Sequence, residues 1–367
     1  MSWDIRQIRR ELHQIPELAF EEDKTHEYVR DLLQRLDGIT LKYFQNSKGI
    51  LVEYSHGEGD YQLFRADMDA LPITENTGVD YSSRQCGMMH ACGHDIHMSV
   101  LLGLIERVCE KKPKANLLFL FQPAEEGKGG AESILSEGII QRYPIHSVYA
   151  LHVASGLPVG TISSREGIFF GIPQEFDVVF TGRSAHAAYP EQGRNALLMG
   201  LTFITLMNTD IEDLQREHRA IFHIGKMVSG TIRNIVPDKC VIEGTHRSLE
   251  KDARDAMNRY IAENARNAAE QLDGEYQVDL LCSYDPVVND GSLERKLREH
   301  CASLNYTYIT ADAAMTGEDF GFFTSMYPGL LFWLGSGSDS PLHSDKFLPD
   351  EDCLEIGINT FYSLIQE

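Results

Sequence analysis

The segment Leu117–Gln122 constrains the fold most strongly, because its unbroken apolar run, LLFLFQ, suits a strand that is buried on both faces. Such strands are typical of parallel sheets that carry helices on both sides. Tyr61–Ala66 and Ser147–His152 also have strand patterns. Apolar residues at helical spacing surround these strands, at Trp3–His13, Thr25–Leu36, Ser99–Cys109 and Gly130–Ile140. This alternation predicts an α/β domain with a largely parallel sheet.

The pattern changes near Gly160. Strand and helix patterns now follow in the order β-α-β-β-α-β, at 174–180, 195–208, 220–226, 239–247, 250–272 and 276–284. This order predicts a small α+β sandwich of the ferredoxin-like kind, with one helical layer on an antiparallel sheet. After about residue 285 the α/β pattern returns, with a strand at Leu330–Leu334 and a final helix from Pro349. The 367 residues are therefore predicted to form an α/β domain, 1–168 and 285–367, interrupted by an inserted domain, 169–284.

The charge balance and the cysteines narrow the classes of partner and compartment. The chain has 33 basic and 55 acidic residues and a net charge of −22, which disfavours nucleic acids and anionic membrane surfaces as partners. No apolar run approaches the ~20 residues of a membrane span, and the amphipathic N-terminus lacks the apolar stretch of a secretion signal. The seven cysteines are scattered without a CxxC pair, which indicates reduced thiols and a cytoplasmic location.

Several reactive residues follow directly after predicted strands. They are Asp67 and Asp69 after the first strand, Glu125 and Glu126 after the second, His152 at the end of the third, and His343 after the strand at 330–334. Cys92 and His94 lie in the segment MHACGHDIH (89–97), at the predicted start of a helix that faces the same edge. The carboxyl ends of parallel strands share one edge, where α/β proteins bind ligands. We therefore expect these side chains to form one site.

Each of these residues also has an ordinary explanation when it is taken alone. The two aspartates could be turn or capping residues, and the adjacent glutamates could belong to a solvated loop. His343 could be part of a Gly- and Ser-rich loop, His152 a hydrogen-bonded core histidine, and Cys92 a buried thiol. Their convergence on one edge of the sheet favours a functional site over packing.

The residue types favour metal-assisted hydrolysis over two other chemistries. Cys92 and His94 could form a nucleophile and base pair, but that pair leaves the two glutamates without a role. A structural zinc site is closed by four Cys or His ligands, whereas sulfur, nitrogen and oxygen donors are dispersed here from Cys92 to His343. In metal-assisted hydrolysis one glutamate binds metal while its neighbour takes a proton from the attacking water. A ligand-binding protein with a degenerate metal site is the alternative of another class.

Motifs along the whole chain resemble those of a known family. They are RRELHQIPELAFEE (9–22), RADMDALPI (65–73), MHACGHDIH (89–97), FQPAEEGKGGAE (121–132), ALHV (150–153), SAHAAYP (184–190), GTIRNIVPD (230–238), MTGEDFGFF (315–323) and PLHS (341–344). Together they are similar to the aminoacylase-type metallopeptidases, peptidase family M20, and to the amidohydrolase branch of that family. This resemblance implies a di-metal amide hydrolase with an α/β catalytic domain and an inserted lid that often forms dimers.

The same resemblance implies roles for individual residues. The metal ligands would be Cys92, His94, Glu126, His152 and His343, and the Cys92 thiolate would bridge two divalent ions. Glu125 would be the general base, and Asp69 would orient a metal-binding histidine. The ligand types admit Mn, Zn, Co or Ni. Asp67 lies where related subfamilies have a histidine ligand, so the resemblance assigns it no single role.

The inserted domain would add two further residues to the site. His186 matches a lid histidine that reaches the oxyanion, either within one chain or across a dimer, and Asn234 is a candidate for holding the substrate's carboxylate. Arg233 and Arg247 are further candidates, although such residues are more often solvated charges. The amino-acid sequence around His186 departs from that of many relatives, so the resemblance defines the lid contacts less well than the metal site.

Within the branch, the segments AEEGKGGAE, EGIFF, AAMTGEDFG and FWLG are most similar to N-acetyldiaminopimelate deacetylases. The expected reaction is metal-dependent hydrolysis of N-acetyl-LL-2,6-diaminopimelate to acetate and LL-diaminopimelate, on the acetylase route to lysine. Another N-acyl amino acid, such as acetylcysteine or hippurate, is the nearest alternative. The expected partners are this small molecule and further copies of the chain, in a homodimer or homotetramer formed through the lid, with no nucleic acid and no membrane.

Overall fold

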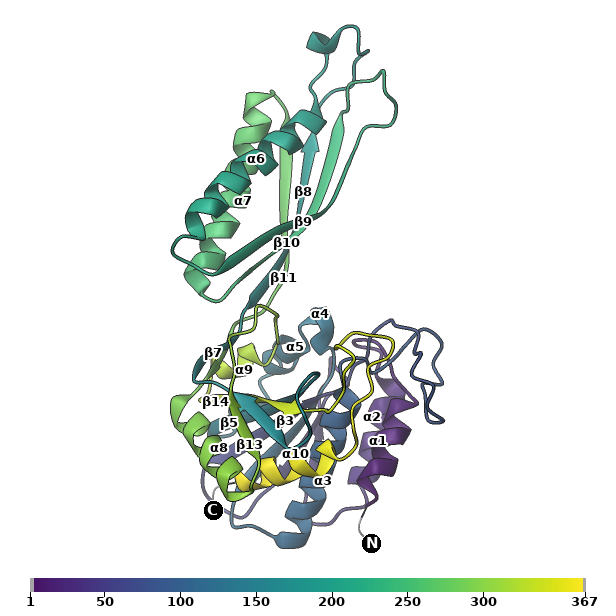
Figure 1. Ribbon diagram of the computed structural model, residues 1–367, viewed down its shortest axis with the longest axis vertical. Helices are drawn as coiled ribbons and strands as arrows, with labels where there is room; N and C mark the ends of the chain where they lie inside the picture. The colour runs from purple at the N-terminus through teal and green to yellow at the C-terminus, as the bar shows by residue number, and fades with distance from the viewer. Residues whose placement is uncertain (1–2, 366–367) are drawn as a thin grey trace. The chain divides into compact units, whose positions relative to one another are not determined.

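The computed structural model describes residues 3–365, which form two compact units (Figure 1). The first unit contains the chain as far as Phe169, then Val287–Asp312, and then the chain from Asp319 onward. The second unit contains Phe170–Pro286 and Ala313–Glu318. The short segment 313–318, which the sequence pattern placed with the first domain, therefore groups with the second unit.

The first unit is built on a ten-stranded sheet, which orders its strands β1-β2-β4-β3-β5-β14-β12-β7, with β6 paired to β14 and β13 to β6. The strands are β1 (Thr40–Tyr43), β2 (Ile50–Tyr54), β3 (Tyr61–Asp67), β4 (Asn116–Gln122), β5 (Ile145–Ala154), β6 (Thr161–Ser164), β7 (Gly167–Phe170), β12 (Val287–Asn289), β13 (Thr307–Thr310) and β14 (Gly329–Gly335). The central strands β4, β3, β5, β14 and β12 run parallel. The prediction of a largely parallel sheet is thus confirmed, and the antiparallel edge made by β1 and β2 was not anticipated.

The helices of this unit are α1 (Ile5–His13), α2 (Asp23–Leu33), α3 (His94–Lys111), α4 (Glu125–Lys128), α5 (Gly130–Ser136), α8 (Gly291–Ser303), α9 (Gly321–Thr324) and α10 (Cys353–Ser363), with a short 3-10 turn at Ile140–Arg142. The last helix was predicted to begin at Pro349, and this prediction is wrong by one turn. Residues 349–350 have no regular structure, 351–352 form a turn, and the helix begins at Cys353. Proline has no backbone N–H to donate, so it suits this approach to the helix as well as its first turn.

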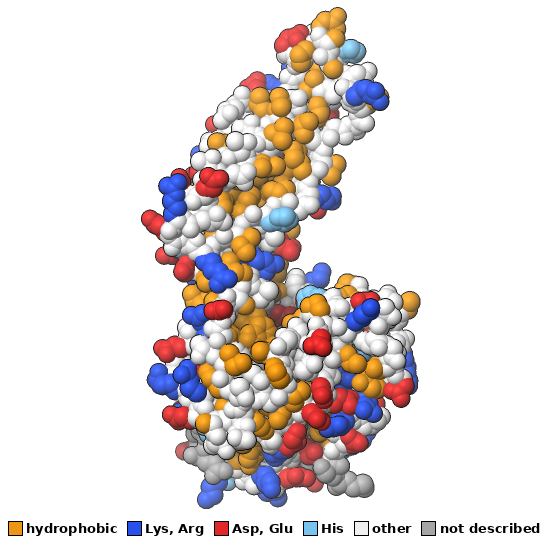
Figure 2. All heavy atoms as spheres, in the orientation of Figure 1, with side chains coloured by type: hydrophobic (Ala, Val, Ile, Leu, Met, Phe, Trp, Pro, Cys, Tyr) orange, Lys and Arg blue, Asp and Glu red, His pale blue; other side chains and the backbone are white. Residues whose placement is uncertain are grey.

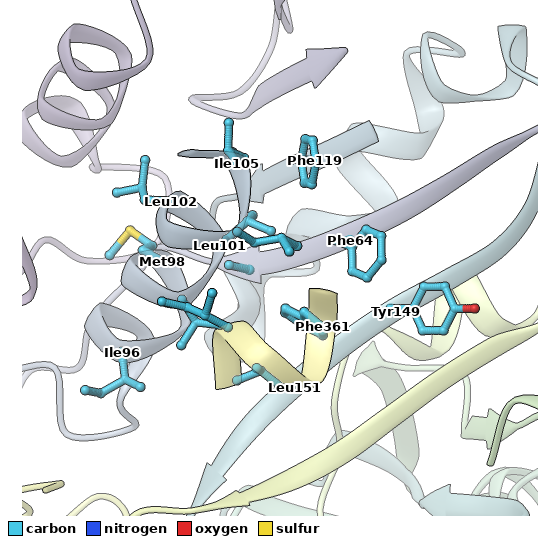
Figure 3. Close-up of a cluster of buried hydrophobic side chains, with 14 of the residues drawn as sticks. Phe64, Ile96, Met98, Leu101, Leu102, Ile105, Phe119, Tyr149, Leu151 and Phe361 are labelled. Carbon is cyan, nitrogen blue, oxygen red and sulfur yellow. The ribbon is translucent and has the colours of Figure 1, made fainter. Parts of the chain in front are cut away.

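The core of the first unit lies between the sheet and α3, with α10 against both (Figure 3). Phe64 of β3 stacks on Tyr149 of β5, with ring centroids 4.9 Å apart, and meets Phe361 of α10 edge-on at 5.3 Å. In β4 the alternate residues Leu118 and Leu120 are also fully buried, so both faces of this strand are covered. β4 is therefore buried on both faces, as its unbroken apolar run predicted.

The second unit is a separate α+β sandwich, as the order of its patterns predicted. Its elements are β8 (Ile172–Thr181), α6 (Ala196–Leu214), β9 (Ala220–Ser229), β10 (Lys239–Ser248), α7 (Lys251–Gln271) and β11 (Glu275–Ser283), with a 3-10 turn at Pro190–Gln192. The four strands pair antiparallel in the order β11-β8-β10-β9. Apolar side chains of the two helices and the sheet form a core of their own, which includes Phe176, Phe180, Phe203 and Met257.

Between residues 3 and 365, no helix has both the length and the apolar character that a membrane crossing requires.

Candidate active site

The parallel strands bring the acidic turns to one edge of the sheet. Asp67 at the end of β3 pairs with Gln122 at the end of β4, so the chain after each strand emerges at the same place. Asp69 and Glu125 follow in these two turns. Asp69 then joins the turns directly, because its Oδ1 accepts a hydrogen bond from Glu125 N at 3.0 Å and its Oδ2 accepts one from Glu126 N at 2.9 Å. A single carboxylate thereby fixes the backbone of both glutamates.

A glycine sets the entry to α3 and places the donors on either side of it. Gly93 has φ +83°, and a Cβ at this position would lie 2.3 Å from Val153 Cγ2. Only glycine tolerates both the left-handed conformation and this close approach. Cys92 and His94 consequently point into the same region from the helix N-terminus, and both are buried.

The donor atoms of four residues, His94, Glu126, His152 and His343, lie close to the sulfur of Cys92. Its Sγ lies 3.3 Å from His152 Nε2 and 3.3 Å from His343 Nε2. His343 Nε2 lies 3.3 Å from Glu126 Oε1. Ligand atoms within 4.8 Å of one another form the groups Cys92–His94–His152 and Cys92–Glu126–His343, and a third group joins His94 to Glu125 and Glu126. The sulfur is thus shared by two groups of potential metal ligands, each of which could hold one ion.

A buried nitrogen with no partner shows that these residues fit a metal ion. His94 Nδ1 faces the carbonyl oxygen of Asp69 at 2.8 Å, an arrangement that fixes Nδ1 as the protonated nitrogen and leaves Nε2 as a lone-pair donor. His94 Nε2 is buried and has no hydrogen-bond partner among the residues that the structure describes. A buried polar atom without a partner is costly, and coordination of a cation would satisfy it.

The electrostatics of the donor set also suit a cation. Burial raises the pKa of the Cys92 thiol well above its usual value, and the carboxylates of Glu126 and Glu125 raise it further. Burial alone would lower the pKa of His94, but Asp67 and Asp69 outweigh it and raise the pKa to about 10. Without an ion Nε2 would therefore hold a proton, which a binding metal would displace. The buried carboxylates that cause these shifts need a positive partner. A thiolate, imidazoles and carboxylates together admit several divalent metals.

Asp67 supports the site through a histidine that the sequence left without a role. Asp67 Oδ1 lies 2.6 Å from His97 Nδ1, and His97 Nε2 accepts a hydrogen bond from Val153 N at 2.9 Å, next to His152. Arg65 Nη1 donates to Asp67 Oδ2 at 2.7 Å. Burial opposes ionisation of Asp67, but His94, His97 and Arg65 hold its pKa well below the usual range.

A second buried network supports the helix that carries His94. Asp95 Oδ2 lies 2.9 Å from Arg9 Nε and 2.7 Å from His13 Nδ1. Both partners come from α1, so this ion pair ties the first helix of the chain to the start of α3. Neighbouring His90 is buried as well, and burial lowers its pKa to about 3.

His186 and Asn234 belong to the second unit, where they lie in neighbouring loops. Ala187 N donates to Asn234 O at 3.0 Å, and His186 forms a bridge with Ile235. Both side chains are exposed. A hollow of about 580 Å³ in this unit is lined by nearby residues, among them Ala187 and Arg233.

Three buried charged residues, Arg65, Asp319 and Glu22, support the site and were not predicted from the sequence. Arg65 donates to Asp67 and also to Asp319 Oδ1 at 2.7 Å, and Asp319 Oδ2 accepts from Ala131 N at 2.9 Å. Glu22 Oε1 accepts from Ala124 N, directly before the glutamate pair. All three are buried. The available signal was a charged residue inside an otherwise apolar stretch, as for the arginine in YQLFRAD, because charges are rarely buried unless they are paired.

The comparisons with known proteins agree with this geometry. The model of peptidase family M20/M25/M40 matches residues 63–367. The chain is 37% identical to an N-acetyldiaminopimelate deacetylase of Oceanobacillus iheyensis, over 100% of this chain and 99% of the relative. It is 35% identical to the enzyme of the same name from Bacillus subtilis, over 96% and 95%.

A solved structure is similar over both units. It is the Bacillus subtilis YXEP protein, described as a dinuclear metal binding peptidase from the M20 family. The likeness has a TM-score of 0.84 at 29% sequence identity and covers 98% of this chain and 96% of that one. On the family match and on the full-length relatives, this chain belongs to peptidase family M20/M25/M40.

Proposed function

We propose that this protein hydrolyses the amide bond of an N-acetyl amino acid with two divalent metal ions, and that its substrate is N-acetyl-LL-2,6-diaminopimelate. The products are acetate and LL-diaminopimelate. The observation that carries the proposal is the adjacent pair Glu125–Glu126 within reach of a thiol shared by two groups of potential metal ligands. A protein that only bound a metal would have no use for a second carboxylate beside the ligand.

Two ligand groups account for two ions. His94 and His152 would hold one ion, Glu126 and His343 would hold the other, and the Cys92 thiolate would bind both. Ions at these positions would supply Lewis acidity, which polarises an amide carbonyl and makes a water molecule more acidic. The ligand types are compatible with each of Mn, Zn, Co and Ni.

Glu125 performs the proton transfers in this proposal. Its carboxylate takes a proton from the attacking water, whose oxygen forms a bond to the acetyl carbon. The carbon–nitrogen bond then breaks, and Glu125 delivers the same proton to the leaving amine. Asp69 holds the backbone N–H of Glu125, so the backbone from which the base projects is fixed. The second proton of the water passes from the new carboxylic acid to the amine. One water is consumed, acetate and an ammonium group are released, and both atoms and charge balance.

The substrate assignment rests on the relatives and on the second unit. Full-length relatives at 35–37% identity are named N-acetyldiaminopimelate deacetylase. In this proposal the second unit acts as a lid, in which His186 stabilises the developing oxyanion and Asn234 holds the substrate's carboxylate. The exposure of both side chains leaves them able to contact a ligand.

A metal-reconstituted assay on a panel of amides tests the function. The purified protein is loaded in turn with Mn²⁺, Zn²⁺, Co²⁺ or Ni²⁺ and offered N-acetyl-LL-diaminopimelate, acetylcysteine, hippurate and simple N-acetyl amino acids. We expect the highest kcat/KM on N-acetyl-LL-diaminopimelate. Loading is followed separately by the fluorescence of Trp333, whose ring lies 5.3 Å from that of His152.

The panel also separates the alternatives. A higher kcat/KM on another N-acyl amino acid would keep the chemistry and replace the substrate. Metal binding without hydrolysis of any amide would favour a ligand-binding protein. Full activity after thorough chelation, combined with inactivation by thiol alkylation, would show a cysteine hydrolase instead.

We also propose that the second unit forms a homodimer. Its strand β9 is at one edge of the sheet, and Val228 on this strand is 54% exposed. Leu198 and Leu201 on α6 are 46% and 49% exposed. Figure 2 shows apolar side chains gathered on the visible face of this unit. Large exposed apolar residues on one element are typical of protein interfaces.

Analytical ultracentrifugation tests this interface. The wild-type protein should sediment as a dimer or tetramer, and Leu201→Glu should sediment as a monomer, because a charge is costly at a buried interface. Glu212→Lys on the same helix is the matched control and should leave the assembly intact. A monomeric wild-type protein would refute the proposed interface.

A further inference from the structure

The carboxyl group of Glu22 is buried against the turn that carries the glutamate pair. Glu22 Oε1 accepts a hydrogen bond from Ala124 N at 2.9 Å, although the two residues are 102 positions apart. The same oxygen accepts from Phe20 N at 3.0 Å. Glu22 is at the N-cap of α2, yet its side chain makes no capping hydrogen bond to that helix. Its carboxyl group therefore serves the distant turn rather than its own helix.

Both N–H donors belong to residues in an unfavourable backbone conformation. Ala124 has φ +58° and Phe20 has φ +67°. Residues with a Cβ rarely adopt this left-handed region, and they remain there only where the surroundings hold them. The turn after Ala124 is tight as well, since Gly130 N donates to Ala124 O at 2.9 Å. A Cβ on Gly130 would lie 1.7 Å from Pro123 O.

Glu22 completes a row of acceptors along this turn. Its Oε1 takes the N–H of Ala124, and the two oxygens of Asp69 take the next two N–H groups, those of Glu125 and Glu126. Three successive N–H groups are thus held by two buried carboxyl groups. The direction in which the Glu125 side chain leaves the backbone depends on the residue before it, and that residue is the one Glu22 holds.

We propose that Glu22 is a positioning residue, which holds Ala124 in its left-handed conformation and so aims the side chain of Glu125 at the substrate. This inference rests on the proposed function of Glu125 as the base. It adds a residue from the N-terminal part of the chain, which contributes neither a metal ligand nor a base to the site.

The surroundings of Glu22 indicate that hydrogen-bond acceptance, rather than charge, is its contribution. Burial raises the pKa of Glu22, and the neighbouring Asp69 carboxylate raises it further, to about 7. Glu22 Oε2 is buried and has no hydrogen-bond partner within residues 3–365. A neutral amide has the same shape and keeps the accepting oxygen, so glutamine should replace this residue well.

The kinetic test compares Glu22→Gln with Glu22→Ala at saturating metal. In Glu22→Ala we expect kcat to fall about 10- to 100-fold, because small misplacement of a catalytic group has effects of this size. KM should stay within about threefold, since the substrate contacts are untouched. Glu22→Gln should keep kcat within about threefold of wild type. The exposed neighbour Glu21→Ala is the matched control and should behave as wild type.

Hydrogen exchange gives a readout that does not depend on activity. Peptic fragments covering 117–130 report on the N–H groups of the turn, and we expect these groups to exchange at least about tenfold faster in Glu22→Ala than in Glu22→Gln. If the alanine variant does not fold, Glu22→Met replaces it, because methionine keeps the volume and lacks a strong acceptor.

A double-mutant cycle tests the conformational step. Glycine adopts the left-handed region without penalty, so Ala124→Gly should reduce the loss caused by Glu22→Ala, and the two effects should not add. Additive losses would overturn the proposal. Unchanged kcat and exchange in a folded Glu22→Ala would also overturn it, as would an equal loss in Glu22→Gln. An inactive wild-type protein would refute the proposed function instead, and the exchange measurement would still decide whether Glu22 holds the turn.

Discussion

The two units of this protein bury ionisable side chains to different extents. In the first unit, ionisable side chains such as Arg65, Asp67, His94 and Asp95 are almost fully buried around the ends of the strands. In the second unit the buried polar residues are Gln174, His246, Ser248, Asn264 and Glu318, and only His246 and Glu318 among them ionise. Burial of charge is expensive, so the first unit maintains it by pairing. The first unit therefore depends on paired buried charges near the candidate site, whereas the second unit depends mainly on its apolar core.

Loss of the proposed base is the largest effect that we expect from this contrast. Glu125→Gln should lower kcat by about 10²- to 10⁴-fold, the range of general acid–base catalysis, while the Trp333 fluorescence response to metal is retained. Glu126→Gln is the matched control and should weaken metal binding as well. Turnover near that of wild type in a metal-loaded Glu125→Gln protein would show that the base is another residue.

Removal of a buried charge should destabilise the first unit far more than a comparable change in the second. Arg65→Met removes the guanidinium that pairs with both Asp67 and Asp319, and breaking a buried pair in this way costs about 3–5 kcal/mol. Met257→Leu in the apolar core of the second unit should cost less than about 1.5 kcal/mol. Urea unfolding at pH 7 measures both. Equal costs would contradict the contrast between the units.

Two buried histidines, His13 of the first unit and His246 of the second, should respond to pH with opposite signs. Burial lowers the pKa of His246 to about 4, so the unfolded chain binds the proton more readily and stability falls by roughly 3 kcal/mol as the pH drops from about 6.5 to 4. Burial would also lower the pKa of His13, but Asp95 and Glu75 outweigh it and raise the pKa. Its contribution is therefore complete below about pH 6.5 and is lost as the pH rises through the folded-state pKa.

The difference between wild type and variant isolates each histidine from the other titrating groups. For His246→Gln, the difference in the free energy of unfolding should change between pH 4 and 6.5 and stay constant above it. For His13→Gln, the change should occur above pH 6.5. If the difference in the free energy of unfolding changed with pH in the same direction for both variants, the opposite pKa shifts of His246 and His13 would be contradicted.

The smallest effect should come from a charge pair on the surface of the second unit. Lys226 Nζ lies 2.6 Å from Glu243 Oε1, and both side chains are about half exposed. Such pairs contribute about 0.2–1 kcal/mol, so Lys226→Gln should barely change the midpoint of urea unfolding. A loss as large as that of Arg65→Met would mean that pairing geometry matters more than burial.

Much of the architecture could be predicted from the sequence because the apolar pattern is periodic and local. The strands β3, β4 and β5, and all six main elements of the second unit, lie where their patterns placed them. The predictions failed at the margins of the first sheet, where β1, β12 and β13 are short and partly exposed. A short edge strand has little apolar pattern, so pairing with its neighbours decides its structure.

The candidate site divides in the same manner. Residue types and their positions after strands indicated Cys92, His94, Glu125, Glu126, His152 and His343 as one site, and the structure brings these side chains together. We propose the roles of these residues as ligands and base. The partners behind them could not be predicted, because Glu22 meets Ala124 only after the chain has passed through four strands and two helices.

The segment LLFLFQ by itself determined that this protein has a sheet covered on both faces, because successive side chains of a strand point to opposite faces and all of these are apolar. The chemistry after that strand was visible in the sequence as two adjacent glutamates. Only the tertiary structure decided how they are held. A hydrogen bond forms only when donor and acceptor are about 3 Å apart and well aligned. The fold brings the carboxyl groups of Glu22 and Asp69 to this turn, although both are distant from it along the sequence.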